Sequence, residues 1–196
     1  MSTRGSTGAS IPQMKASHMQ SNVVCLALLG EAKEAEVRAA CSEIIAEIDA
    51  SIRSTWLPVE LDVVLTQAVE DICGAEATEE WARQAVYQSA KGPLMGPIIG
   101  GLTRLGLGPR HGLRRVPAVW NLIYRNCGSM SCEADPGVAS LVLKSPTPKM
   151  NDTYLRGIGA AFEGLILILG STVTESTAKI EAGEVRYRVR WSRPNH

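Results

Sequence analysis

His111 is the residue with the widest chemical options, because the other two histidines, His18 and His196, lie near the ends of the chain. A Ser–His–Asp or Cys–His site would have to use it. The sequence has no GxSxG, HExxH or paired CxxC pattern, and residues 128–132 (GSMSC) lack the spacing of a nucleophile elbow. We therefore predict no catalytic residue. A small enzyme that uses His111 with a nearby Cys or Ser stays open as the alternative.

Metal and cofactor binding find equally little support. Cys127 and Cys132 alone are too few ligands for a structural zinc ion. His111 as an axial haem ligand is an open alternative, but a lone polar residue in an arginine-rich turn is more often simply exposed. We predict no metal site and no cofactor.

Two groups of arginines could bind an acidic partner or a phosphate. Arg186, Arg188 and Arg190 alternate with apolar residues, so strand geometry places them on one face. A solvated sheet face paired with residues such as Glu175 and Glu181 is the favoured explanation. The second group surrounds His111 and a helix start, where surface solvation is again favoured over an anion site. Its candidate residues are Arg110, Arg114 and Arg115.

A ligand pocket is the third candidate site. The few aromatic residues follow helical and strand spacing and are expected mainly in the core. Pockets in such folds lie between helices and sheet, and a cavity lined by Trp120, Tyr124, Phe162 and Leu165 is predicted as a candidate. Three glycines in the last helix each cost up to about 1 kcal/mol relative to alanine, which indicates close backbone approach to a helix, the sheet or a ligand. They are Gly157, Gly159 and Gly164.

The pattern of the chain predicts mainly helices first and local hairpins later. A weak strand signal lies at 23–29, and an amphipathic helix is expected from Lys33 to about Asp49. A second helix is expected to begin at Trp56-Leu57-Pro58 and to end at Gly74, and Thr78 is expected to cap a third. A fourth, short helix is expected over 94–105. Two more helices, separated by a break at Pro117, are expected to follow. Hairpins are expected at 129–144 and 174–191, with a loop at 146–150 and a long helix capped by Asp152 between them.

This order predicts an α+β fold with an N-terminal helical region packed on a small antiparallel sheet of two hairpins. The chain of 196 residues, about 45% apolar, suits one domain over residues 20–196. Residues 1–19 are polar and Ser/Gly-rich, and their end at Ser17-His18-Met19 is typical of an expression leader, which places the start of the fold at about Met19.

Charge and cysteine content limit the partners and the compartment. The 20 basic and 20 acidic residues balance, which argues against nucleic acid as the main partner. The longest apolar runs fall far short of the roughly 20 residues that span a bilayer. Five cysteines, an odd number with three in apolar positions, are best explained as free thiols in a reducing cytosol. We expect a cytoplasmic protein.

Three segments carry a resemblance to a known family: WLPVELDVVLTQAVEDICG at 56–74, GLRRVPAVWNLIYRNCG at 112–128 and GEVRYRVRW at 183–191. In this order they resemble a family of mostly myxobacterial proteins of unknown function. That family is similar in turn to the superfamily of haem–nitric-oxide binding domains, four-vinyl reductase domains and transport-particle subunits. The resemblance implies a non-catalytic α+β module that binds a ligand or a partner and is often dimeric. Haem binding is not carried over, because the Tyr-x-Ser-x-Arg motif is missing and His111 is not in a recognisable proximal-ligand helix.

The sequence thus favours a non-enzymatic regulatory module that binds a partner protein or an apolar small molecule. The rivals are the enzyme built on His111 and a structural subunit of a homo-oligomeric assembly. The resemblance implies a homodimer, whereas the residues themselves give neither the oligomeric state nor the identity of the ligand or partner.

Overall fold

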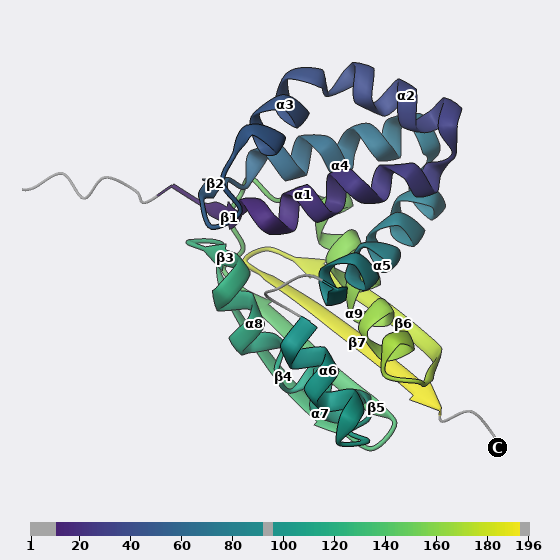
Figure 1. Ribbon diagram of the computed structural model, residues 1–196. Helices are drawn as coiled ribbons and strands as arrows, with labels where there is room; N and C mark the ends of the chain where they lie inside the picture. The colour runs from purple at the N-terminus through teal and green to yellow at the C-terminus, as the bar shows by residue number, and fades with distance from the viewer. Residues whose placement is uncertain (1–10, 92–95, 193–196) are drawn as a thin grey trace, which may run out of the picture.

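The fold joins a layer of N-terminal helices to a four-stranded antiparallel sheet (Figure 1). The computed structural model describes residues 11–91 and 96–192. The helices are α1 (Ala16–Cys25), the short 3-10 helix η1 (Leu26–Leu29), α2 (Glu31–Ala40), α3 (Ser42–Ala50), α4 (Glu60–Cys73), α5 (Ala75–Lys91), α6 (Gly96–Arg104), α7 (Pro109–Leu113), α8 (Val116–Ile123) and α9 (Asp152–Ile168). The strands are β1 (Gln13–Lys15), β2 (Trp56–Pro58), β3 (Tyr124–Arg125), β4 (Ser129–Asp135), β5 (Val138–Lys144), β6 (Thr172–Glu181) and β7 (Glu184–Ser192).

The larger sheet confirms the predicted α+β class and both predicted hairpins. Its strand order is β4-β5-β7-β6, and all of its pairings are antiparallel. The two hairpins turn at Gly137 and Gly183, whose φ angles of 82° and 79° favour glycine. The long helix α9 connects the hairpins, as the sequence predicts. A register shift between Val173 and Glu175 interrupts the pairing of β6 with β7.

Alternation along the strands gives the sheet one buried and one solvent-exposed face. Leu141 lies opposite both Cys132 and Tyr187 in the register, and Leu143 lies opposite Met130 and Val185. Leu141, Leu143 and Val185 have no exposed surface. Helices α7, α8 and α9 cover this side, and the opposite face carries the β7 arginines. The helices therefore pack on one face, as their clustering in the sequence predicts.

A second, smaller sheet with the order β2-β1-β3 was not predicted. Met14 of β1 pairs with Leu57 on one side and with Tyr124 on the other. Trp56 contacts two cations, with Lys15 Nζ 4.2 Å and Arg125 Cζ 3.9 Å from the ring centroid. Strands of two or three residues are too short to produce a periodic signal in the sequence, which explains why this sheet was missed.

The start of the fold differs from the expectation of a leader ending at Met19. Residues 13–15 form the central strand of the small sheet, and α1 begins at Ala16. Met14, Ala16 and Met19 are fully buried. The polar composition of residues 1–19 concealed these buried apolar positions.

The strand expected at 23–29 is wrong. The segment is the end of α1 followed by η1, because Met19, Val23 and Leu26 form one buried helical face while Val24 and Leu28 are exposed. It ends at the predicted glycine, Gly30, with φ of 84°.

The helix expected from Lys33 to Asp49 is divided at Cys41, where φ is −115° and ψ is 23°. The N–H of Cys41 still donates to the carbonyl of Val37, and the N–H of Ile45 donates to the carbonyl of Cys41. Hydrogen bonds between residues four positions apart therefore continue across the break. This explains why the apolar residues of α2 and α3 keep the spacing of one continuous helix.

The expected starts of three helices also shift by a few residues. Trp56–Pro58 forms β2 and the helix begins at Glu60, whereas its end at Gly74 is confirmed by a φ of 87°. Thr78 lies inside α5, and its hydroxyl donates to the carbonyl of Gly74 at 2.9 Å. Asn151 rather than Asp152 caps α9, because its side chain accepts a hydrogen bond from the N–H of Tyr154.

The pair of helices around Pro117 is confirmed as α7 and α8, and the helix expected at 94–105 is α6 as far as the described residues extend. Buried apolar residues from both the helical layer and the larger sheet belong to one core cluster. Within residues 11–91 and 96–192, every helix is too short or too polar to cross a bilayer.

Candidate functional site: a buried polar network beside a small cavity

The candidate site is a cavity of about 80 Å³ between the helical layer and α9. Its apolar wall comes mainly from α5 and α9, including Ala85 and Ile158. Its polar residues come from other elements: His18 and Asn22 from α1, Asp62 and Thr66 from α4, Tyr124 from β3 and Tyr154 from α9. The cavity therefore combines a mostly apolar wall with a concentrated group of hydrogen-bonding atoms.

Asp62 is the centre of the polar group. Its carboxylate accepts two hydrogen bonds from Asn22 Nδ2, at 2.9 and 3.1 Å, and one from the Tyr154 hydroxyl at 2.9 Å. The oxygens of Tyr154 and Tyr124 lie 3.0 Å apart, within hydrogen-bond distance. Asp62 and Tyr154 are 1% and 5% exposed. A buried carboxylate is costly unless it is well hydrogen-bonded, and here three hydrogen bonds from two donor groups compensate it.

Which group donates in each hydrogen bond among Asp62, Tyr154 and Tyr124 follows from the number of protons that the hydroxyl groups can donate. Tyr154 has one hydroxyl proton, and the carboxylate is a better acceptor than the sulfur of Met14, which lies 3.4 Å away. When Tyr154 donates to Asp62, the hydrogen bond between the tyrosines must be donated by Tyr124. The Tyr124 oxygen then keeps acceptor capacity at the wall of the cavity.

Burial displaces the pKa of several groups here. It raises the pKa of Asp62, while the hydrogen bonds from Asn22 and Tyr154 oppose that increase. Desolvation also raises the pKa of both Tyr124 and Tyr154, and the nearby Asp62 carboxylate raises them further. Burial lowers the pKa of His18 to about 4. The histidine is therefore neutral at physiological pH.

The close packing of α9 on α5 forms one side of the site and confirms the interpretation of the α9 glycines. A Cβ atom on Gly164 would lie 2.4 Å from the carbonyl oxygen of Arg83, and one on Gly157 would lie 3.7 Å from Ala82 Cβ. On the sheet side, a Cβ on Gly159 would lie 3.3 Å from the Tyr187 ring. Two of these glycines thus approach a helix and the third approaches the sheet.

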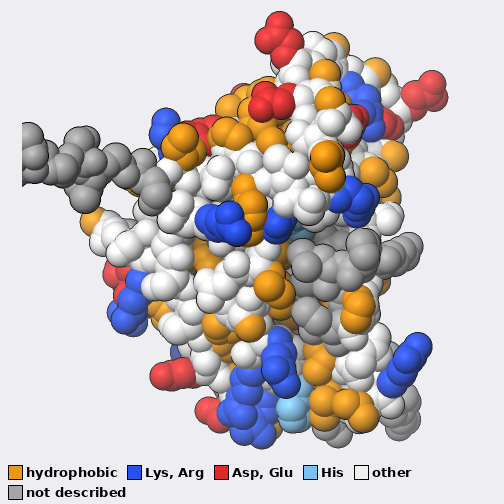
Figure 2. Space-filling view, turned by 60° about the vertical axis from the view of Figure 1, so that its left-hand side comes forward, with side chains coloured by type: hydrophobic (Ala, Val, Ile, Leu, Met, Phe, Trp, Pro, Cys, Tyr) orange, Lys and Arg blue, Asp and Glu red, His pale blue; other side chains and the backbone are white. Residues whose placement is uncertain are grey.

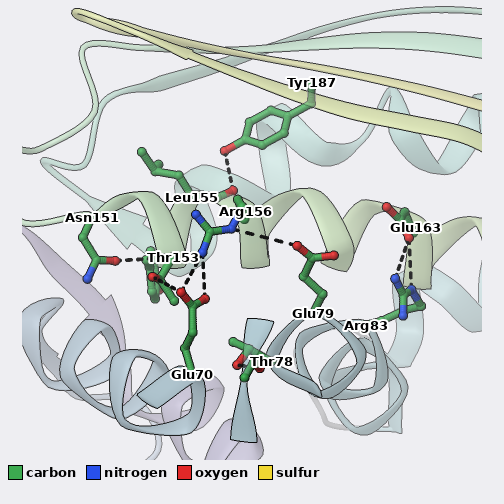
Figure 3. A network of polar contacts seen from close by, with 12 residues as sticks. Glu70, Thr78, Glu79, Arg83, Asn151, Thr153, Leu155, Arg156, Glu163 and Tyr187 are labelled. Atoms are coloured by element: carbon green, nitrogen blue, oxygen red, sulfur yellow. Dashed lines mark hydrogen bonds and ion pairs between the residues drawn. The ribbon is translucent and has the colours of Figure 1, made fainter. Parts of the chain in front are cut away.

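Ion pairs fix α9 against α4 and α5, as Figure 3 shows. Arg156 donates from one nitrogen to both oxygens of Glu70, at 2.8 and 2.7 Å, and Thr153 donates to the same carboxylate at 3.1 Å. Further along α9, Arg83 donates twice to Glu163 Oε2, at 3.1 and 2.8 Å. These contacts join residues that lie 80 or more positions apart in the sequence, so they hold the cavity wall in a defined position.

The four predicted pocket residues do not line one cavity. Tyr124 lines the cavity described above, and Trp120 stacks on it with ring centroids 4.0 Å apart. Phe162 packs edge-on against Tyr187 at 5.2 Å, on the sheet side of α9. Leu165 lies near Gly112 of α7. One of the four predicted residues therefore belongs to the candidate site.

The predicted arginines around His111 have structural contacts. Arg110 Nε and an Arg114 guanidinium nitrogen both donate to the carbonyl of Ala134, at 3.2 and 2.8 Å. Arg115 is exposed beside a groove between α6 and α8. The first two arginines thus help to attach α7 to β4.

The arginines of β7 form the exposed face that their alternation predicts. Arg190 pairs with Glu175 at 3.1 Å, as expected, and Arg186 pairs with Glu184. Glu181 instead pairs with Lys179 at 2.6 Å. Arg188 lies between Ser140 and Thr177 in the register. An acidic partner of this face remains a prediction.

His111 lies exposed on α7, at a surface hollow of about 680 Å³ that Arg110, Ser171 and several glycines also line. The residues lining this hollow include no carboxylate that could orient the imidazole. Among the residues that the structure describes, no group of three or more His, Cys, Asp or Glu side chains could hold a metal ion.

The central residues of the site, Asp62, Asn22 and Tyr154, were missed by the sequence analysis. An acidic residue in the first turn of a helix ordinarily favours the positive end of the helix dipole, but Asp62, Leu65 and Val69 are three and four residues apart and share one face of α4. An acidic residue in line with the apolar stripe is the signal that could have revealed the site.

Comparisons with known proteins place the fold. No protein-family model and no curated protein matches the chain. Three solved structures of similar fold are an H-NOX protein from K. algicida, an oxygen-binding H-NOX domain related to soluble guanylate cyclases, and a variant of the T. tengcongensis H-NOX. Their sequence identities to this chain are 12%, 13% and 12%, in the order named, and the TM-scores of the superpositions are 0.62, 0.63 and 0.61. The matches cover 93%, 92% and 93% of this chain and 99%, 96% and 100% of the other chains. Over most of its length, the chain therefore has the fold of the H-NOX domains.

Proposed function

We propose that this chain is a non-enzymatic regulatory module that binds a compact, mainly apolar small molecule in the cavity beside Tyr154. The observation that supports the proposal is the Asp62–Tyr154–Tyr124 hydrogen-bond chain, which is buried and ends at an apolar-walled cavity. A network of this kind is expensive to bury, and it supplies hydrogen-bonding oxygen atoms at the cavity wall that an apolar core would lack.

The polar atoms of the cavity indicate which ligand would fit. Tyr124 offers an acceptor oxygen, so a ligand hydroxyl or amine would donate to it. Trp81 also lines the cavity, and its buried indole N–H has no hydrogen-bond partner among the described residues. His18 is neutral, and the Asp62 carboxylate is already occupied by the hydrogen bonds from Asn22 and Tyr154. An uncharged alcohol or phenol matches these features.

Haem does not fit this cavity. Drug-sized ligands occupy sites of about 300–1,000 Å³, and haem is larger than most of them, whereas the cavity has about 80 Å³. Its one histidine, His18, lies on α1 among the polar residues, and His111 lines the separate surface hollow. We therefore assign no role that depends on haem.

The test is a thermal-shift and calorimetric screen of compact probes: phenol, indole, cyclohexanol and benzyl alcohol. A ligand that binds only the folded state raises the Tm as its concentration exceeds the Kd. We expect at least one probe to raise the Tm of the wild-type protein. Ala161→Leu, which narrows the cavity at a half-buried position of its wall, should abolish the shift.

Ala39→Leu on α2 is the matched control, because it adds the same atoms at an exposed site outside this cavity. It should keep the ligand-induced rise in Tm. A screen in which no probe shifts the wild-type Tm would refute the proposal, as would an equal shift in Ala161→Leu.

The proposal also includes the cellular location of the module, its relatives and its partner. Among the described residues, no disulfide joins any two of the five cysteines, which supports a reducing, cytoplasmic location. The three quoted segments support kinship with the myxobacterial-type proteins. A regulatory role further requires a partner protein that responds to ligand binding. If an activity is found, His111→Ala separates the rival enzyme hypothesis, because unchanged activity would exclude a catalytic His111.

A further inference from the structure

The balanced charge of the chain conceals two halves of opposite sign. Residues 1–91 contain 13 acidic and 7 basic residues, and residues 92–196 contain 7 acidic and 13 basic residues. In Figure 1, helices α2 and α3 lie at one end of the molecule, and α6, α7 and α8 lie at the other. Figure 2 shows Lys and Arg side chains at the lower end and Asp and Glu side chains projecting at the upper end, with side chains of both signs on the surface between them. The two halves of the chain therefore differ in net charge.

The basic end carries an apolar groove of about 330 Å³ between α6 and α8. Leu105 is 74% exposed and Leu122 is 45% exposed, and both line the groove. Arg115 also lines it, and Arg104 is exposed at the end of α6. Within the described part of the chain, the guanidinium group of neither arginine forms an ion pair or a hydrogen bond. The groove thus combines exposed leucines with two uncompensated positive charges.

The acidic end carries the complementary combination. Helix α3 contains Glu43, Glu47 and Asp49 and no basic residue. These three carboxylates are exposed, and none forms an ion pair with another residue in 11–91 or 96–192. Ile52 follows α3 and is 75% exposed, the highest value among the large apolar residues described. Arg53 comes next, but the acidic residues outnumber it.

We propose that the α6–α8 groove of one molecule binds the α3 end of a second copy, with Ile52 against the leucines and the α3 carboxylates beside Arg104 and Arg115. The argument is charge complementarity between two exposed apolar sites that each hold unpaired charges of one sign. Because the two surfaces differ and lie at opposite ends, the contact is head-to-tail, so it forms a ring or an open chain rather than a closed two-fold dimer.

The first test is light scattering of the full chain over a range from micromolar to millimolar concentration. At low ionic strength the mass should rise beyond that of a dimer as the concentration increases. In about 1 M salt the association should weaken by about tenfold, because exposed charges are then screened. A wild-type protein that remains monomeric throughout this range overturns the proposal.

The second test mixes two variants. Leu122→Glu blocks the groove, and Glu43→Lys with Glu47→Lys reverses the charge of α3; all three positions are exposed. Each variant alone should be monomeric, because each molecule keeps one of the two surfaces. An equimolar mixture should form a dimer and nothing larger, since the intact α3 of the first variant can bind the intact groove of the second.

Val64→Glu is the matched control, because Val64 is 47% exposed on α4 and is not one of the residues that form either surface. It should associate like the wild type. Arg115→Glu is a second groove variant that repeats the test if Leu122→Glu alters the circular dichroism spectrum. A mixture that stays monomeric while the wild type associates would exclude the head-to-tail contact.

Discussion

At the scale of single residues, Tyr154 is the side chain on which the buried network depends. Tyr154→Phe removes the hydroxyl that donates to Asp62 and accepts from Tyr124. Leaving buried polar groups without partners costs about 1–3 kcal/mol, so we expect a loss of about 2 kcal/mol in urea denaturation. Tyr187→Phe is the control, because its hydroxyl makes one hydrogen bond, to the carbonyl of Leu155, and should cost about 1 kcal/mol. Equal losses in the two variants would argue against the network.

His18 and Asp62 should give the free energy of unfolding two opposite pH dependences. The pKa of His18 falls from 6.5 to about 4 on folding. Between these values the unfolded chain binds more protons, so this contribution to stability is lost as pH falls from 6.5 to about 4. It amounts to at most about 3 kcal/mol. For Asp62, the folded pKa lies above the ordinary value of 3.8, so stability decreases as pH rises above that value.

Denaturation of variants at a series of pH values separates the two groups. His18→Gln should remove the rise in stability between pH 4 and 6.5, whereas Asp62→Asn should remove the opposing decrease and make the rise steeper. The exposed His111→Gln is the control and should leave the wild-type profile unchanged. An unchanged profile in His18→Gln would contradict the assignment of this pH range to His18.

At the scale of elements, the contact of α5 with α9 should be the least tolerant of added atoms. Gly164→Ala places a Cβ 2.4 Å from the backbone oxygen of Arg83, and backbone cannot move aside like a flexible side chain. We expect a loss of about 1–3 kcal/mol. Gly100→Ala, in α6 with nothing within 4 Å of the new Cβ, should be neutral or stabilising by up to about 1 kcal/mol. The midpoints of urea denaturation of the two variants and of the wild type are compared. An unchanged midpoint in Gly164→Ala would show that α5 and α9 can move apart without a loss in the free energy of unfolding.

The elements also show what can be predicted from a sequence. The hairpins and α9 were predicted because period-two alternation, turn glycines and a helical stripe are local signals. The small sheet was not, since Met14, Leu57 and Tyr124 come together only through tertiary contacts. The candidate site was predicted least well. Its polar residues come from four separate elements, and Tyr124 alone was among the predicted residues.

At the scale of the whole molecule, the helical layer and the sheet should unfold together. One apolar core runs through both, and the Arg156–Glu70 and Arg83–Glu163 pairs join α4 and α5 to α9, which packs on the sheet. Trp56 and Trp81 lie in the helical part, while Trp120 and Trp191 lie against or in the larger sheet. We expect tryptophan fluorescence and circular dichroism to report one coincident urea transition. Two separate transitions would contradict a single domain over residues 20–196.

The register shift between Val173 and Glu175 has a consequence for how copies of this protein can meet. Strand β6 is an edge of the larger sheet, ten residues long, and most of its side chains are exposed. Long edge strands invite pairing with other chains, and irregular backbone with charged side chains prevents it. The shift and the charges of Glu175, Lys179 and Glu181 make β6 a poor template for a further strand. Growth by sheet extension, the route to insoluble fibres, is thereby discouraged at this edge.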